Sequence, residues 1–166
     1  TTSGVIYSDK PQIKVFMAYA KEDEAYKNKL SRHLTLLKRR KQIAEFAMGE
    51  VGLGKAKDKA IKEQLNIAHI ILLLISDNFL HSESCYEIEQ VAMERHAENS
   101  VVVVPIYIKY ADTFGAHFTE LQSLPRNGVP IANWLDADEA YTHISKELRV
   151  LVDSFKNQDK EEDEWN

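Results

Sequence analysis

The chain has almost no cysteine and no long apolar run, and each absence narrows its possible roles. Cys85 is the single cysteine among 166 residues, which excludes an internal disulfide and a zinc site built from several cysteines. No apolar run is long enough to span a bilayer and no signal peptide is visible. We therefore expect, by default, a cytoplasmic protein that does not contact membranes.

The chain has no excess of positive charge, because its 26 acidic residues outnumber its 21 lysines and arginines. The formal net charge is −5, and no basic face is evident, so direct binding to nucleic acid is not expected. The four cations at 38–41 fit the C-terminal end of a helix, where they complement the helix dipole. The six histidines show no metal-ligand spacing, so no metal site is predicted.

What is present is the composition of one globular domain. Hydrophobic residues make up 44% of the chain, enough for a full core. Strand patterns alternate with helix patterns; the strands are expected at 13–19, 43–46, 70–75, 101–108 and 129–131. This alternation predicts an α/β fold, a flavodoxin-like three-layer sandwich with a mostly parallel five-stranded sheet that binds ligands at its C-terminal edge.

The domain has expected boundaries at both ends. Residues 1–11 show no periodic pattern and are interpreted as an N-terminal lead-in. The domain itself is predicted over 12–156, and its last helix over 136–155. Residues 157–166 are highly charged and low in apolar content, which favours a disordered acidic tail or a linker.

Residues 70–96 carry the most informative pattern. The continuous apolar run at 70–75 is typical of a strand that is covered on both faces. After a short turn, Ser84 and Glu87 have the spacing of a capping box, with Ser84 as the N-cap of a helix. Ile88 and Ala92 would then lie on its buried side.

The register of this predicted helix places two nearby glutamates, Glu87 and Glu89, on different sides of it. Glu87 has a capping role available, whereas Glu89 lies about 200° further round a helix of 3.6 residues per turn. Glu89 is thus expected beside Cys85 and Tyr86, at the border of the apolar face. A carboxylate near a helix start, at the C-terminal edge of a sheet, is well placed to face a ligand.

A glycine-rich segment follows the second predicted strand. Gly49 to Lys55 nearly matches the phosphate-binding loop G-x-x-x-x-G-K-[ST], but Ala56 replaces the hydroxyl residue that would hold Mg²⁺. We interpret the match as chance and the segment as a strand-to-helix turn.

Four segments together resemble a TIR (Toll/interleukin-1 receptor) domain of the kind found in bacterial immune proteins. They are KVFMAY with KED at 14–23, the glycine loop at 49–54, AHIILLLISDNFL with SESCYEIE at 68–89, and VPI at 104–106 with 121–130 and Trp134. The third segment is the most specific of the four. The resemblance covers roughly residues 12–155.

The resemblance implies an activity and a site. Enzymatic members of the family cleave NAD⁺ at the nicotinamide–ribose bond, and the position of their catalytic glutamate corresponds to Glu89. NAD⁺ would be the substrate, and no cofactor is implied. The substrate-binding positions would be Ala18, Tyr19, Met48, Gly49, Cys85 and Tyr86, and the assembly loop would contain Gly52, Leu53 and Gly54.

The resemblance also implies partners. Family members self-associate through their TIR domains, and a sensor domain fused beyond the C-terminal tail is expected to drive that assembly. Ala18, Met48 and Leu53 depart from the residues common in the family. Two other functions are therefore weighed: a non-enzymatic TIR module for homotypic signalling, and a related α/β enzyme that acts on nucleosides.

Overall fold

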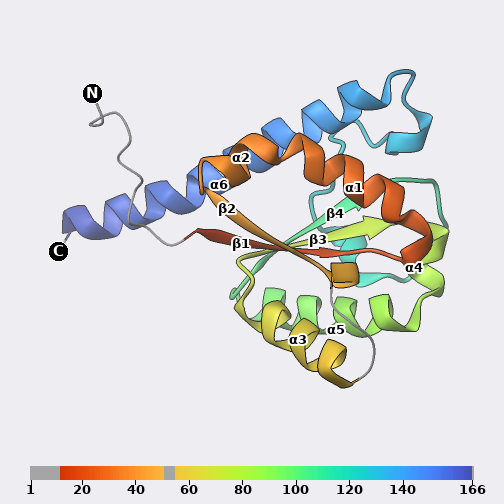
Figure 1. The fold of residues 1–166 in the computed structure, drawn as a ribbon, viewed down its shortest axis with the longest axis horizontal. Coiled ribbons are helices and arrows are strands. Elements are labelled where there is room, and N and C mark those ends of the chain that lie inside the picture. Colours follow the sequence, from red (N-terminus) through yellow and green to blue (C-terminus); the bar gives the residue numbers. More distant parts are fainter. Residues whose placement is uncertain (1–11, 51–54, 166) are drawn as a thin grey trace.

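The computed structural model describes residues 12–50 and 55–165, which form one sheet with helices on both faces (Figure 1). The strands are β1 (Ile13–Ala18), β2 (Ile43–Ala47), β3 (Ile70–Ile75) and β4 (Val102–Tyr107). Their order is β2-β1-β3-β4, and each neighbouring pair is parallel. The predicted flavodoxin-like α/β fold is confirmed.

The described residues form four strands, so the prediction of a fifth was wrong. Residues 129–131 lead instead into a 3-10 helix, η5 (Ile131–Asn133). Pro130 has no N–H to donate to a sheet, and Leu124 already pairs with the open edge of β4 through a parallel bridge to Ile106. Ile131 nevertheless fills the core, because its side chain is buried.

The place of β3 in the sheet explains its sequence. It has a parallel neighbour on each side and helices above and below, so all six of its residues are buried. A strand with no solvent-facing side needs apolar residues at every position. Pro105 lies in β4 at the edge of the sheet, where a residue without an N–H to donate is tolerated.

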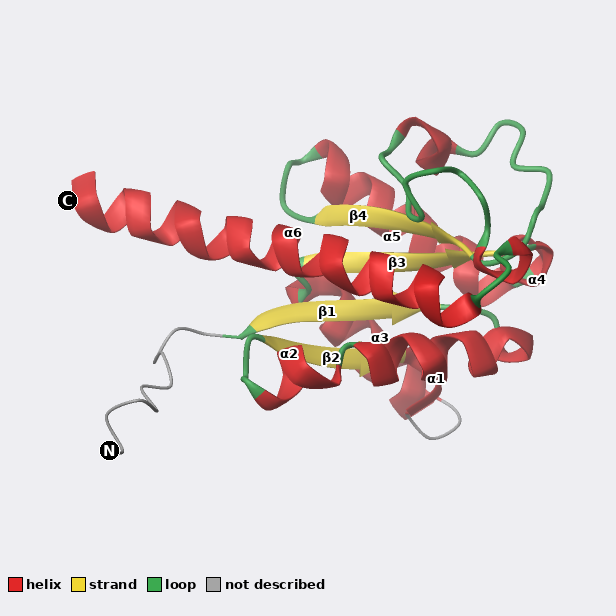
Figure 2. Ribbon diagram, turned by 90° about the horizontal axis from the view of Figure 1, so that it is seen from above, coloured by secondary structure: helices red, strands yellow, loops and turns green. Residues whose placement is uncertain are grey.

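Two layers of helices enclose the sheet (Figures 1 and 2). One face carries α3 (Lys55–Ile67) and α5 (Glu83–Ala97). The other carries α1 (Glu24–His33), α2 (Thr35–Arg39) and α6 (Ala137–Trp165). The short α4 (Asp77–His81) follows β3 directly and lies at the carboxyl ends of the strands.

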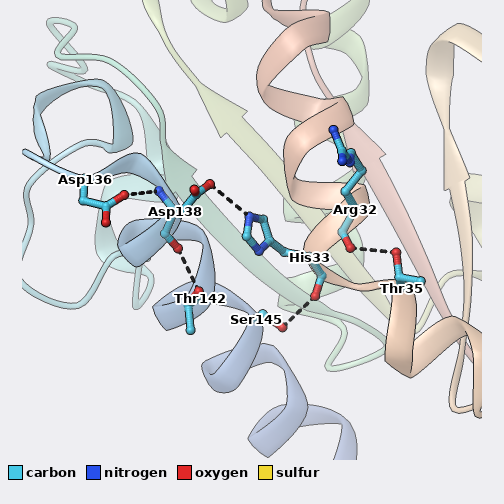
Figure 3. A network of polar contacts seen from close by, with 7 residues as sticks. All are labelled: Arg32, His33, Thr35, Asp136, Asp138, Thr142 and Ser145. Atoms are coloured by element: carbon cyan, nitrogen blue, oxygen red, sulfur yellow. Dashed lines mark hydrogen bonds and ion pairs between the residues drawn. The ribbon is translucent and has the colours of Figure 1, made fainter.

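Polar contacts, drawn in Figure 3, and one aromatic contact join α1 to α6. The ring of His33 stacks on Tyr141, with centroids 5.2 Å apart and planes inclined by 6°. His33 Nε2 lies 3.7 Å from Asp138 Oδ1, and the Ser145 hydroxyl donates a 3.0 Å hydrogen bond to the His33 carbonyl. These contacts fix α6 against the first helix and complete this face of the domain.

The last helix is longer than its sequence pattern predicted. It was expected to end at Phe155, but α6 continues to Trp165 and extends beyond the sheet (Figure 2). The charged segment contains neither proline nor glycine and is rich in residues with high helix propensity, so nothing in it breaks the helix. Within the described ranges, no helix combines the length and apolar character needed to cross a membrane.

Candidate active site

A cavity of about 530 Å³ lies at the carboxyl ends of β1, β2 and β3, next to α4 and the start of α5. Parallel α/β sheets bind their ligands at this edge. Its walls offer both signs of charge, hydroxyl groups and an amide, which suits a polar ligand. The lining residues are Tyr19, Lys21, Glu22, Glu24, Met48, Gly49, Lys57, Asn78, His81, Ser82 and Ser84.

A buried network ties the ends of two strands together beneath this cavity. Asp23, at the end of the 3-10 helix η2 (Lys21–Asp23), is 0% exposed. It accepts hydrogen bonds from the Ser76 hydroxyl and, at 3.0 Å, from the Asn78 amide. The Ser76 hydroxyl also accepts from the Phe79 N–H at 3.1 Å, so it caps α4. The network therefore joins the segment after β1 to the segment after β3.

The start of α5 differs from its predicted form. Ser82, not Ser84, is the N-cap, and its hydroxyl accepts a 3.2 Å hydrogen bond from the Cys85 N–H. The predicted capping box of Ser84 with Glu87 is thus wrong. The reason is α4, which ends at His81, so that the chain turns at Ser82 straight into the next helix.

Glu87 and Glu89 of α5 lie in different surroundings, as the helical periodicity predicted. Glu87 is exposed and lines a groove of about 310 Å³ between α3 and α5. Glu89 is only 7% exposed. Within residues 12–50 and 55–165, no group forms a hydrogen bond with its carboxylate. Burial raises the pKa of Glu89 above its ordinary value, and the nearby His117 in η4 (His117–Glu120) opposes part of that rise.

The structure brings together only part of the predicted site. Tyr19, Met48 and Gly49 line the cavity. Glu89 does not line the cavity, because Glu89 lies one helical turn beyond Cys85, which is itself fully buried. Tyr86, which directly follows Cys85 in α5, is 57% exposed.

The remaining predicted site residues either do not line the cavity or lie outside the described residues. Ala18 is fully buried inside β1. Gly52, Leu53 and Gly54 lie outside the described residues. Burial raises the pKa of the Cys85 thiol to about 11, so this thiol is unsuited to act as a nucleophile near neutral pH. In the described part of the chain, no group of three His, Cys, Asp or Glu residues is placed to hold a metal ion.

Sequence reasoning missed the network of Asp23, Ser76 and Asn78. All three residues lie in segments that carry the family resemblance, but none of them was predicted to belong to a site. A signal existed, since polar residues that follow adjacent parallel strands meet at the same edge of the sheet. It could be used only once β1 and β3 were known to be neighbours.

The fold defines an α/β domain of the flavodoxin-like class, and its cavity lies at the sheet edge where such folds bind ligands. Comparison with known families is more specific: the model of the TIR domain family matches residues 15–144. The chain therefore belongs to the TIR domain family.

A relative is known from Sinorhizobium fredii (strain NBRC 101917 / NGR234), the uncharacterized protein y4lF. It is 39% identical over 136 residues, which cover 81% of this chain and 42% of the relative. The chain thus spans less than half the length of this relative.

Proposed function

We propose that this TIR domain cleaves NAD⁺ at the nicotinamide–ribose bond and that Glu89 is the essential carboxylate. The environment of Glu89 carries the proposal. Its side chain is 7% exposed and forms no hydrogen bond within the described ranges, on a helix that begins beside a polar cavity. Burial of most of this side chain disfavours the charged carboxylate, and carboxylates whose pKa is raised in this way are found preferentially at functional sites.

One carboxylate is sufficient for this chemistry. Nicotinamide leaves the cationic pyridinium of NAD⁺ as a neutral molecule, so the leaving group needs no general acid. The C–N bond breaks while positive charge develops on the ribose, as in glycoside hydrolysis, and water then completes the reaction. The Glu89 carboxylate would stabilise that positive charge and hold the ribose hydroxyls.

The position of Glu89 adds a requirement for assembly. Because Glu89 does not line the cavity of the single domain, the substrate and the carboxylate must be brought together by a rearrangement. Self-association of TIR domains would supply that rearrangement. Turnover is therefore expected from assembled protein and not from the isolated monomer.

The biological setting follows from the same proposal. We place the domain in the cytoplasm as the effector of a prokaryotic immune system that acts against phage. A sensor domain fused beyond the C-terminal end would trigger assembly. The helix α6 reaches past the sheet and would form a stiff connection to such a domain (Figure 2).

A second function is favoured by one observation. The same separation of Glu89 from the cavity would be expected of a TIR module that signals by homotypic association without chemistry. In that case the cavity would have no catalytic role, and Glu89 would be dispensable for signalling.

NAD⁺ consumption in assembled and monomeric protein separates the two functions. Assembly would be followed by light scattering while NAD⁺ and nicotinamide are quantified by chromatography. The enzyme predicts that nicotinamide appears together with the assembled fraction. Assembled protein that leaves NAD⁺ intact would support the interaction module instead.

A further inference from the structure

Tyr19 is held between two elements of the cavity wall. It follows β1 directly and its side chain is 4% exposed. Its hydroxyl accepts a 3.1 Å hydrogen bond from the N–H of Gly49, which lies 30 residues further along the chain. On α1, the Lys27 ammonium lies 5.4 Å from the centre of the Tyr19 ring. The phenol thus has little freedom to move.

Gly49 has no side chain at a place where one would collide with this phenol. A Cβ at position 49 would overlap the Tyr19 hydroxyl oxygen, whereas it would lie 3.5 Å from Tyr19 Cζ, an ordinary contact. The φ angle of Gly49 does not require glycine, since it falls outside the left-handed region. The close approach of the hydroxyl is therefore the reason for glycine here.

The same residues shape the cavity. Tyr19, Met48 and Gly49 all line it, and Met48 also lines the adjoining groove between α3 and α5. Met48 is 7% exposed and begins η3 (Met48–Glu50), directly after β2. The Tyr19–Gly49 hydrogen bond consequently fixes η3, which follows β2, against the end of β1.

We propose that Tyr19 is a positioning residue: its hydroxyl, through the Gly49 N–H, holds Met48 and Gly49 as a preformed wall of the cavity. This rests on the proposed function, because the wall matters to catalysis only if NAD⁺ binds there. A preformed wall spares the substrate the cost of ordering it. Loss of the hydroxyl should therefore weaken substrate binding and leave the chemical step unchanged.

Three variants test this role by kinetics in assembled protein. Tyr19→Phe removes the hydrogen bond from the Gly49 N–H and should raise KM for NAD⁺ about fivefold, with kcat within about twofold of wild type. Gly49→Ala should be more severe, because its methyl group displaces the phenol. The double variant Tyr19→Phe/Gly49→Ala should recover to the level of Tyr19→Phe, because the atom that collides is gone. Tyr110→Phe, at a 67% exposed tyrosine outside the cavity, should match wild type.

Two measurements without NAD⁺ separate this proposal from the proposed function. Hydrogen exchange of the Gly49 amide by NMR should be slow in wild type and fast in Tyr19→Phe. The melting temperature should fall in Gly49→Ala and recover in the double variant. These results would support the positioning role even if no NAD⁺ were cleaved. Equal exchange in wild type and Tyr19→Phe, or a double variant no better than Gly49→Ala, would overturn it.

Discussion

Replacing Glu89 by glutamine should stabilise the folded domain at neutral pH. Glu89 is 7% exposed and makes no hydrogen bond within the described ranges, so burial disfavours its ionised form, and the nearby His117 opposes only part of that effect. Glutamine keeps the shape of the side chain and removes the charge. We expect the free energy of unfolding to rise by about 1 kcal/mol, from removal of a partly desolvated charge, since the amide of glutamine gains no partner of its own. For a domain of this size, that is about 2–4 °C in melting temperature.

The dependence on pH follows from the direction of the pKa shift. Burial raises the pKa of Glu89 in the folded state, so the folded protein binds a proton more tightly than the unfolded chain does. The contribution of Glu89 to stability therefore falls as pH rises from its unfolded pKa through its raised folded pKa. The advantage of Glu89→Gln should accordingly be full above the folded pKa and should vanish below the unfolded one.

The assay is urea denaturation of wild type and Glu89→Gln across a range of pH, with exposed Glu87→Gln as the matched control on the same helix. Glu87→Gln should follow the wild-type curve, because its carboxylate is solvated in both states. A Glu89→Gln protein that is less stable than wild type at neutral pH would refute the reasoning. It would mean that the ionised carboxylate is held by favourable contacts.

Three further predictions concern stability and reactivity. Ser82→Ala should lower the free energy of unfolding by about 1 kcal/mol in a denaturation experiment, as the loss of an N-cap does, whereas Ser84→Ala should change it by only about a few tenths of a kcal/mol. Equal losses for the two variants would contradict the assignment of Ser82 as the N-cap. Asp23→Ala should cost about 2–3 kcal/mol by the same measurement, because the buried hydroxyl of Ser76 loses its charged acceptor, and a cost near zero would contradict the network. Cys85 should react with iodoacetamide at pH 8 far more slowly in folded than in urea-unfolded protein, because it is buried and its pKa is raised to about 11; similar rates would show that the thiol is accessible.

The four strands could be predicted because their sequences leave little choice. The run at 70–75 is apolar at each position, as a central parallel strand requires. The fifth strand was predicted at 129–131 as part of the alternation of strands and helices, yet Leu124 pairs with the open edge of β4. Tertiary contacts decide which segment pairs with the edge strand of a sheet, and a local sequence pattern gives no information about those contacts.

The cap of α5 shows a similar limit. Ser82 and Ser84 can both cap a helix, and only Ser84 has a glutamate three residues later. The choice is made by α4, whose end at His81 leaves Ser82 as the turn between two helices. The helix α4 has only 5 residues, too few to give a periodic signal, so it was not predicted from the sequence.

For the site, the helical period was sufficient to separate Glu89 from Glu87, since the first is buried and the second exposed. It could not give the relation of Glu89 to the cavity. That relation depends on how Cys85 packs in the core and on which residues of η2 and α4 close the space above the strands. Such packing is set by the whole fold.

Nicotinamide release by assembled protein tests the central claim most directly, when wild type, Glu89→Gln and Glu87→Gln are measured side by side. The account predicts release by wild type and Glu87→Gln at similar rates and none by Glu89→Gln, although all three proteins assemble equally. Release by Glu89→Gln at the wild-type rate would contradict the assignment of Glu89. No release by any of the three proteins, once assembled, would contradict the enzymatic function itself.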